Sequence, residues 1–95
     1  MRITKEFIKR NIAGDTILVP IGDTAQNFNG MITLTDSAEF IWDNLEKTDN
    51  MDEMVQRILA EFNVDEATAR RDVAGFIGEL LRHGIAECTK RDKSW

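Results

Sequence analysis

The side chains best suited to chemistry in this chain are one histidine and one cysteine, His83 and Cys88, five positions apart. A cysteine beside a histidine can form an activated thiolate, but such a nucleophile also needs a group that orients the histidine and donors that hold an oxyanion. The sequence shows no pattern that would supply either. Two ligands are also too few for a closed zinc site, which takes four. We therefore expect no catalytic residue, no metal and no cofactor.

Paired acids and glycines give no further sign of catalysis. Asp52–Glu53 and Asp65–Glu66 stand where helices are predicted to begin, and carboxylates there interact favourably with the helix dipole. The glycines follow neither the GxxxxGK[ST] nor the GxGxxG spacing of phosphate-binding loops. The sequence thus predicts a protein that is not an enzyme.

Short β-branched segments precede any helical pattern. Residues 7–21 hold two of them, split by Gly14–Asp15, which predicts a hairpin with its turn at the glycine. Pro20 cannot donate to a strand ladder, so we expect it at an edge, at a bulge or at a strand's end. Residues 22–30 are rich in turn formers, and the alternation in residues 30–35 predicts a third strand.

Three helices are predicted after this sheet. Apolar residues at helical spacing indicate helices over residues 37–46, from Asn50 to about Phe62, and from Asp65 to Gly84, and Trp42 lies on the apolar stripe of the first. Residues 85–87 predict a further short strand. This order is typical of an α+β fold, in which helices pack on one face of a three-stranded antiparallel sheet.

Size and charge restrict the class of protein. With 95 residues, of which 42% are hydrophobic and 31% charged, we expect a single globular domain with a core over residues 7–87 and a loose tail over 88–95. The net charge of −5 argues against a partner held by its phosphates. A lone cysteine needs no oxidising compartment, and no apolar run is long enough for a membrane span or an export signal. We therefore expect a cytoplasmic protein without a membrane or nucleic-acid partner.

Several segments occur in a telling order along the chain. These are LVP at 18–20, Asn29–Gly30, Leu34–Thr35 with the stripe Ala38, Ile41, Trp42 and Leu45, then MDEMVQRILAEFNVD, then ARRDVAGFIGELLRHGI. The ordered set, from about Phe7 to Glu87, resembles the PqqD family and the related peptide-recognition domains of ribosomal peptide maturation. The resemblance implies a winged-helix-like fold that binds no DNA. It further implies that the domain holds the leader segment of a precursor peptide as an added strand, beside its third strand and against its third helix, and presents it to a modifying enzyme, often a radical S-adenosylmethionine enzyme. The family serves many pathways besides pyrroloquinoline quinone synthesis.

The third predicted strand is the natural place for such a peptide. An exposed sheet edge offers unpaired backbone donors and acceptors, while neighbouring side-chain pockets give selectivity. The alternative is a strand that is central in the sheet or covered by a loop. The peptide-binding residues predicted here are Met31, Ile32, Thr33, Leu34 and Thr35.

The third helix has a second face of small residues with a basic residue at each end. That face is formed by Arg71, Ala74, Gly75, Gly78 and Arg82. A glycine inside a helix costs about 0.5–1 kcal/mol relative to alanine, so two of them suggest close approach of another backbone. We expect a peptide to bind there, and we hypothesise that the two arginines engage its acidic side chains. Alternatively, the glycines pack against the protein's own first helix or a second subunit, and the arginines are solvated.

Two other functions compete with peptide binding. Three helices and a β-wing are also the layout of winged-helix transcriptional regulators, with the third helix reading DNA. In that helix, however, Glu66, Asp72 and Glu79 interrupt the positive charge. The other alternative is a self-assembly or docking domain, with a homodimer formed through the exposed strand edge.

Overall fold

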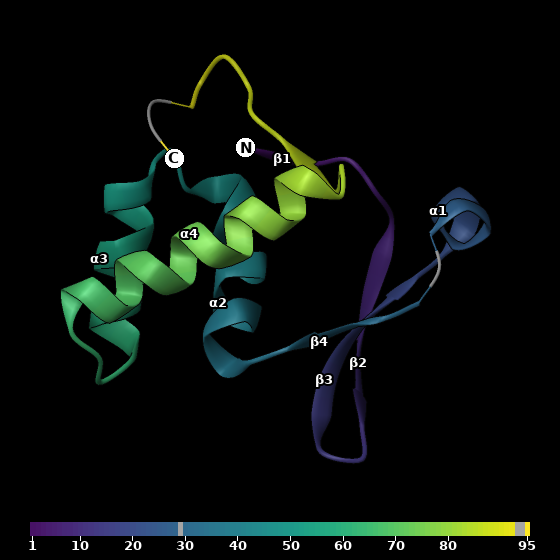
Figure 1. The fold of residues 1–95 in the computed structure, drawn as a ribbon, viewed down its shortest axis with the longest axis horizontal. Coiled ribbons are helices and arrows are strands. Elements are labelled where there is room, and N and C mark those ends of the chain that lie inside the picture. The colour runs from purple at the N-terminus through teal and green to yellow at the C-terminus, as the bar shows by residue number, and fades with distance from the viewer. Residues whose placement is uncertain (29, 93–94) are drawn as a thin grey trace.

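The computed structural model describes residues 1–28, 30–92 and 95. Its elements in chain order are β1 (Arg2–Ile3), β2 (Phe7–Ile12), β3 (Asp15–Pro20), α1 (Gly22–Asn27), β4 (Ile32–Leu34), α2 (Asp36–Asn44), the 3-10 turn η1 (Leu45–Lys47), α3 (Met51–Glu61), α4 (Glu66–Arg82) and β5 (Ala86–Glu87). Figure 1 shows α2, α3 and α4 packed together, with the β2–β3 hairpin projecting away from them and β4 running between the two parts. The predicted α+β class is confirmed.

The main sheet is antiparallel, with the strand order β2-β3-β4. Its hairpin turns at Ala13 and Gly14, which have φ values of 53° and 86°. A two-residue turn with both φ values positive matches the twist of the flanking strands, and glycine takes such a φ at no steric cost. The turn at the glycine is as predicted, whereas Asp15 already belongs to β3. Pro20 ends that strand, which is one of the positions expected for it.

β4 lies at the edge of this sheet. It pairs with β3 from Ile32, opposite Leu18, to Leu34, opposite Thr16. In the part of the chain that the structure describes, β4 has no partner on its other side. The strand is shorter than the predicted 30–35, since Gly30 and Met31 precede it and Thr35 leaves the ladder to cap α2.

The segment between the hairpin and β4 corrects the prediction of a loop over residues 22–30. It contains α1, a helix of six residues. Its Thr24 is buried, and the hydroxyl oxygen of Thr24 accepts a 2.8 Å hydrogen bond from the backbone N–H of Glu6. The helix is thus held by a contact across the chain, which no local sequence pattern predicts.

The longer helices begin at side-chain caps. The hydroxyl of Thr35 accepts from the N–H of Ala38 at 3.2 Å, so α2 starts at Asp36, one residue before the predicted start. Asn50 and Asp65 each accept a 2.8 Å hydrogen bond from the N–H three residues on, as predicted for α3 and α4. At the other end of α4, Gly84 has a φ of 67°, which confirms it as the left-handed residue after the helix.

The hydrophobic core lies between these three helices and the two chain ends. Its buried residues are Met1, Ile41, Leu45, Met54, Val55, Ile58, Ala69, Val73, Ile77, Leu80, Ile85 and Ala86. Trp42 is half-buried beside this core, edge-to-face with Phe7 at a ring distance of 6.0 Å, which confirms its predicted packing role. Among the described residues, no helix is both long enough and apolar enough to cross a bilayer.

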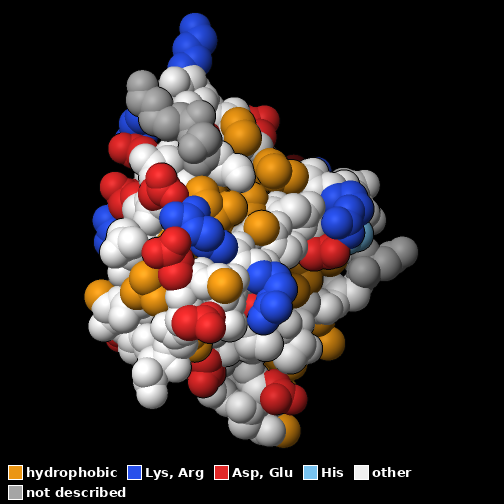
Figure 2. Space-filling view, turned by 60° about the vertical axis from the view of Figure 1, so that its left-hand side comes forward, with side chains coloured by type: hydrophobic (Ala, Val, Ile, Leu, Met, Phe, Trp, Pro, Cys, Tyr) orange, Lys and Arg blue, Asp and Glu red, His pale blue; other side chains and the backbone are white. Residues whose placement is uncertain are grey.

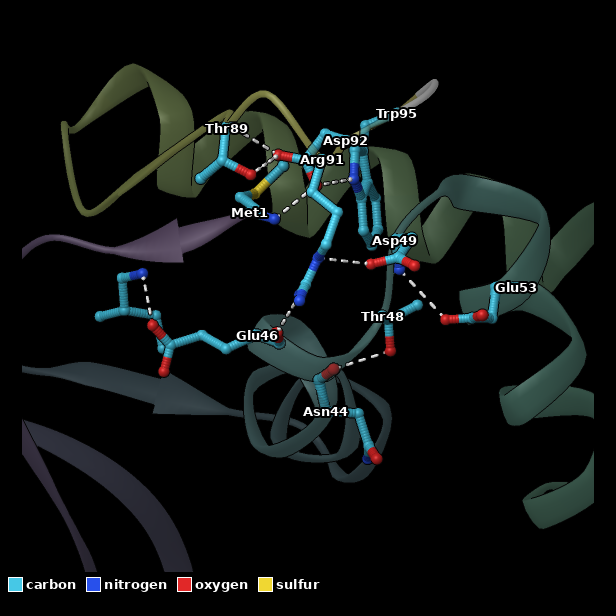
Figure 3. A network of polar contacts seen from close by, with 11 residues as sticks. Met1, Asn44, Glu46, Thr48, Asp49, Glu53, Thr89, Arg91, Asp92 and Trp95 are labelled. Atoms are coloured by element: carbon cyan, nitrogen blue, oxygen red, sulfur yellow. Dashed lines mark hydrogen bonds and ion pairs between the residues drawn. The ribbon is translucent and has the colours of Figure 1, made fainter.

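The two chain ends are joined by a network of polar contacts (Figure 3). β1 pairs with β5, the strand predicted over 85–87, although a two-residue β1 was not predicted. The Asp92 carboxylate accepts from the N-terminal ammonium, from the N–H of Thr89 at 2.6 Å and from the indole N–H of Trp95 at 3.1 Å. These contacts were not anticipated for a tail predicted to be loose. Lys93 and Ser94 of that tail, and Asn29 before β4, lie outside the described residues.

Candidate functional site

A groove of about 490 Å³ lies between β4, the first turn of α2 and α4. Apolar side chains form most of its floor, and polar ones stand along its rim. The residues that line it are Phe28, Ile32, Thr33, Thr35, Ser37, Ala38, Ile41, Asp72, Phe76, Glu79, Leu80, His83 and Ile85. The groove thus runs beside the unpaired edge of β4.

Three of the five strand residues predicted to bind a peptide line this groove: Ile32, Thr33 and Thr35. Leu34 is instead buried, at 6% exposure, and does not line the groove, although it lies on the same face of the strand as Ile32. Met31 is 60% exposed and stands just before the strand. The strand therefore offers both a backbone edge and an apolar side chain to the groove.

The helix contributes a stripe that differs from the predicted one. Asp72, Phe76, Glu79 and His83 line the groove, with Leu80 beneath them. Their spacing of four, three and four residues places them on one side of α4. The sequence interpretation assigned Phe76 to the core stripe alone, whereas its ring is half-buried and serves both the core and the groove. The sequence did hold a signal for this stripe, because polar residues occur three and four positions from the aromatic residue Phe76.

The predicted second face of α4 lies elsewhere. None of Arg71, Ala74, Gly75, Gly78 and Arg82 lines the groove. A methyl group added at Gly75 or Gly78 would meet no described atom within 4 Å, so the alternative in which these glycines pack against the protein's own first helix is wrong. Their role in binding a peptide stays a prediction.

Charges around the groove are mostly negative. Arg82 and then His83 pair with Glu79 and hold the pKa of that carboxyl below its ordinary value. Asp72 is half-buried and takes part in no ion pair within the described residues. On the face shown in Figure 2, basic and acidic side chains are interspersed. Elsewhere on α4, Arg70 pairs with Asp52 at 2.8 Å and with Glu66 at 3.1 Å.

A second hollow, of about 360 Å³, continues from one end of the groove. The two share Phe28 and His83, and the rest of the second hollow is polar. Its other lining residues are Thr4, Lys5, Glu6, Asp23, Thr24 and Asn27. A ligand longer than the apolar groove would therefore reach a polar surface with two carboxylates, Glu6 and Asp23, and one ammonium group, Lys5.

Cys88 and His83 form no hydrogen bond with each other among the described residues. Cys88 is exposed, and His83 Nε2 lies 3.2 Å from a Glu79 carboxylate oxygen. Within residues 1–28, 30–92 and 95, no three His, Cys, Asp or Glu side chains gather as a metal site would require. The groove is thus a surface suited to binding, with an apolar floor, a backbone edge and a charged rim.

Comparison with known proteins gives a family match and two similar structures. A family model described as coenzyme PQQ synthesis protein D (PqqD) matches residues 15–86. TbiB1 in complex with the TbiA(beta) leader peptide is 26% identical, with a TM-score of 0.67 over 94% of this chain and 98% of that one. A lasso peptide synthetase B1 complexed with the leader peptide shares the fold at 21% identity, with a TM-score of 0.68 over 92% of this chain and 96% of that one. No curated protein sequence matches the chain significantly.

Proposed function

Because the chain belongs to the PqqD family, we propose that it binds the leader segment of a precursor peptide as a strand added to the open edge of β4. The observation that carries the proposal is the position of that edge, which borders an apolar groove walled by α4. Two proteins of similar fold, described in complex with leader peptides, support it.

Strand addition fits the geometry of this site. The residues from Met31 to Thr35 would span about 13–17 Å of extended chain, which matches a short peptide strand. Hydrogen bonds from the peptide backbone to the edge would give affinity with little demand on sequence. Selectivity would come from side chains that enter the groove, whose apolar lining includes Ile32 and Phe76.

The domain would act as a carrier and not as a catalyst. It would hold the leader segment while a separate modifying enzyme, such as a radical S-adenosylmethionine enzyme, acts on the rest of the precursor. We place this step in the cytoplasm, since the single cysteine, Cys88, needs no oxidising compartment.

The test uses peptides whose backbone can no longer pair. Leader segments of small precursor peptides encoded beside the gene are titrated into isotope-labelled protein and followed by NMR, and the tightest binder is selected. Two versions of that peptide are then N-methylated at alternate residues, one at the odd and one at the even positions. Since alternate N–H groups of an added strand point at its partner, one version should lose binding and the other should retain it.

Equal effects of the two methylation patterns would refute strand addition. Chemical shift changes should centre on β4 and on the groove-facing stripe of α4. Binding elsewhere on the molecule would refute the proposed site, and the absence of any binding peptide would refute the function.

Self-assembly through the same edge is a distinct candidate, because an open edge can pair with a second copy. Sedimentation of the protein with and without peptide separates the two. If the edge serves the peptide, a monomer should bind it; a dimer that peptide fails to dissociate would favour assembly.

A further inference from the structure

We infer that the bound segment is basic, with a Lys or Arg two residues from the apolar side chain that fills the groove, and that this cation pairs with Asp72. The inference rests on the proposed function and deepens it. It identifies the chemical class of peptide that the site selects.

The spacing follows from the two elements that form the groove. Asp72 and Phe76 are four residues apart on α4, which places them about 6 Å apart along the helix axis. Residues i and i+2 of an extended peptide face the same side and lie about 6.5–7 Å apart. In the view of Figure 1, α4 and β4 run along similar lines with opposite chain directions. A peptide strand beside β4 would therefore place one side chain over Phe76 and the next on that side near Asp72.

The charge that a bound peptide should carry follows from the ion pairs that the groove-lining carboxylates already form. Glu79 has its charge compensated by Arg82, whereas Asp72 has no such partner among the described residues. The polar hollow that continues the groove adds the carboxylates of Glu6 and Asp23 against Lys5. An acidic peptide would meet repulsion along this path, and a basic one would be attracted.

Neither Arg71 nor Arg82 pairs with Asp72 among the described residues. Arg82 is outside the lining residues and already pairs with Glu79, while Arg71 lies on the same outer face. Acidic peptide residues, which those arginines were expected to engage, would have to contact another side of α4. The groove itself selects the opposite charge.

A selection from random peptides tests the inference and does not require the natural peptide. A displayed library of random 12-residue peptides is selected on the immobilised protein, and the enriched sequences are read. We expect Lys or Arg to be enriched two positions from an enriched apolar residue. In the tightest peptide, Lys→Gln should weaken binding by about twofold to fivefold, within the range for an exposed charged pair.

Protein variants then assign the cation to its partner. With Asp72→Asn, the Lys and Gln peptides should bind equally, and selection on Asp72→Lys should enrich Asp or Glu at that position. The matched control is Asp15→Asn, which makes the same change at the exposed hairpin, outside the groove. Circular dichroism of each variant shows that it is folded.

The outcomes separate the inference from the proposed function. Enriched peptides with no basic residue at that spacing, or with acidic ones, would overturn the inference and leave peptide binding intact. A Lys preference that persists in Asp72→Asn would also overturn it. Failure to select any peptide with the wild-type protein would count against the proposed function itself.

Discussion

Phe76 is the residue whose removal best tests the groove, because its ring serves both the core and the proposed site. A peptide that covers roughly 80 Å² of this ring gains about 2 kcal/mol at about 25 cal/mol per Å². Phe76→Ala should therefore raise the dissociation constant of a bound leader peptide by about thirtyfold. The half of the ring that packs inside should cost about 2 kcal/mol of folding stability, less than the loss for a fully buried phenylalanine.

A matched variant separates binding from stability. Phe62 is also half-buried against the core, but it packs edge-to-face on Phe40 at 5.5 Å and does not line the groove. Phe62→Ala should lose a similar amount of stability in urea denaturation and keep its peptide affinity in fluorescence anisotropy. Phe76→Leu should recover most of the affinity, because leucine restores apolar area.

The reasoning fails if both alanine variants weaken binding equally. That result would mean that the peptide responds to the general stability of the helices and does not contact the Phe76 ring. An unchanged affinity in Phe76→Ala, measured in folded protein, would refute the groove as the site.

Two further predictions concern α4. Gly75→Ala should stabilise the protein by about 0.5–1 kcal/mol in urea denaturation, because alanine is the better helix former and the added methyl group meets open space. Peptide affinity should stay unchanged, and weaker binding would instead place the peptide on the glycine face. Hydrogen bonds from Thr68 lower the pKa of Asp65 below its ordinary value of 3.8, so the stability that Asp65 contributes is fully present above that value and is lost as pH falls through the lowered pKa. Asp65→Asn keeps a helix cap that does not titrate, so the urea midpoint of this variant should fall less between pH 5 and pH 2 than that of the wild-type protein. Equal falls in the two proteins would refute the pH-dependent contribution of Asp65.

The elements that the sequence predicted well are those whose signals are local. Asn50 and Asp65 accept the hydrogen bonds that begin α3 and α4, and Gly84 adopts the left-handed φ that follows α4. Each of these depends on a few adjacent residues and their backbone geometry. The hairpin turn at Gly14 was predictable for the same reason.

The elements that the sequence missed depend on contacts between distant segments. α1 is held through Thr24 by the backbone of Glu6, 18 residues earlier. β1 exists only because it pairs with β5 at the other end of the chain. Neither segment has enough residues for a periodic pattern, so only the tertiary arrangement could reveal them.

The groove stripe was missed for a different reason. Helical periodicity sorts the residues of α4 into a core face and an outer face, and it assigned Phe76 to the first. The boundary between the faces borders the groove because β4 has no further strand partner there among the described residues, which leaves room beside Asp72, Phe76 and Glu79. A single-helix projection contains no information on where a neighbouring sheet stops.

The shortness of β4 also bears on how an open edge avoids self-pairing. A long, flat and apolar edge strand invites association with other chains, whereas short edges are protected. β4 has three residues and is followed at once by the cap of α2 at Thr35, so a second copy could form few hydrogen bonds with it. A peptide bound as proposed would gain more than these backbone hydrogen bonds, because its side chains would also enter the groove beside Phe76 and the carboxylate of Asp72. We therefore expect the edge to favour a peptide of matching side chains over a second copy of the protein.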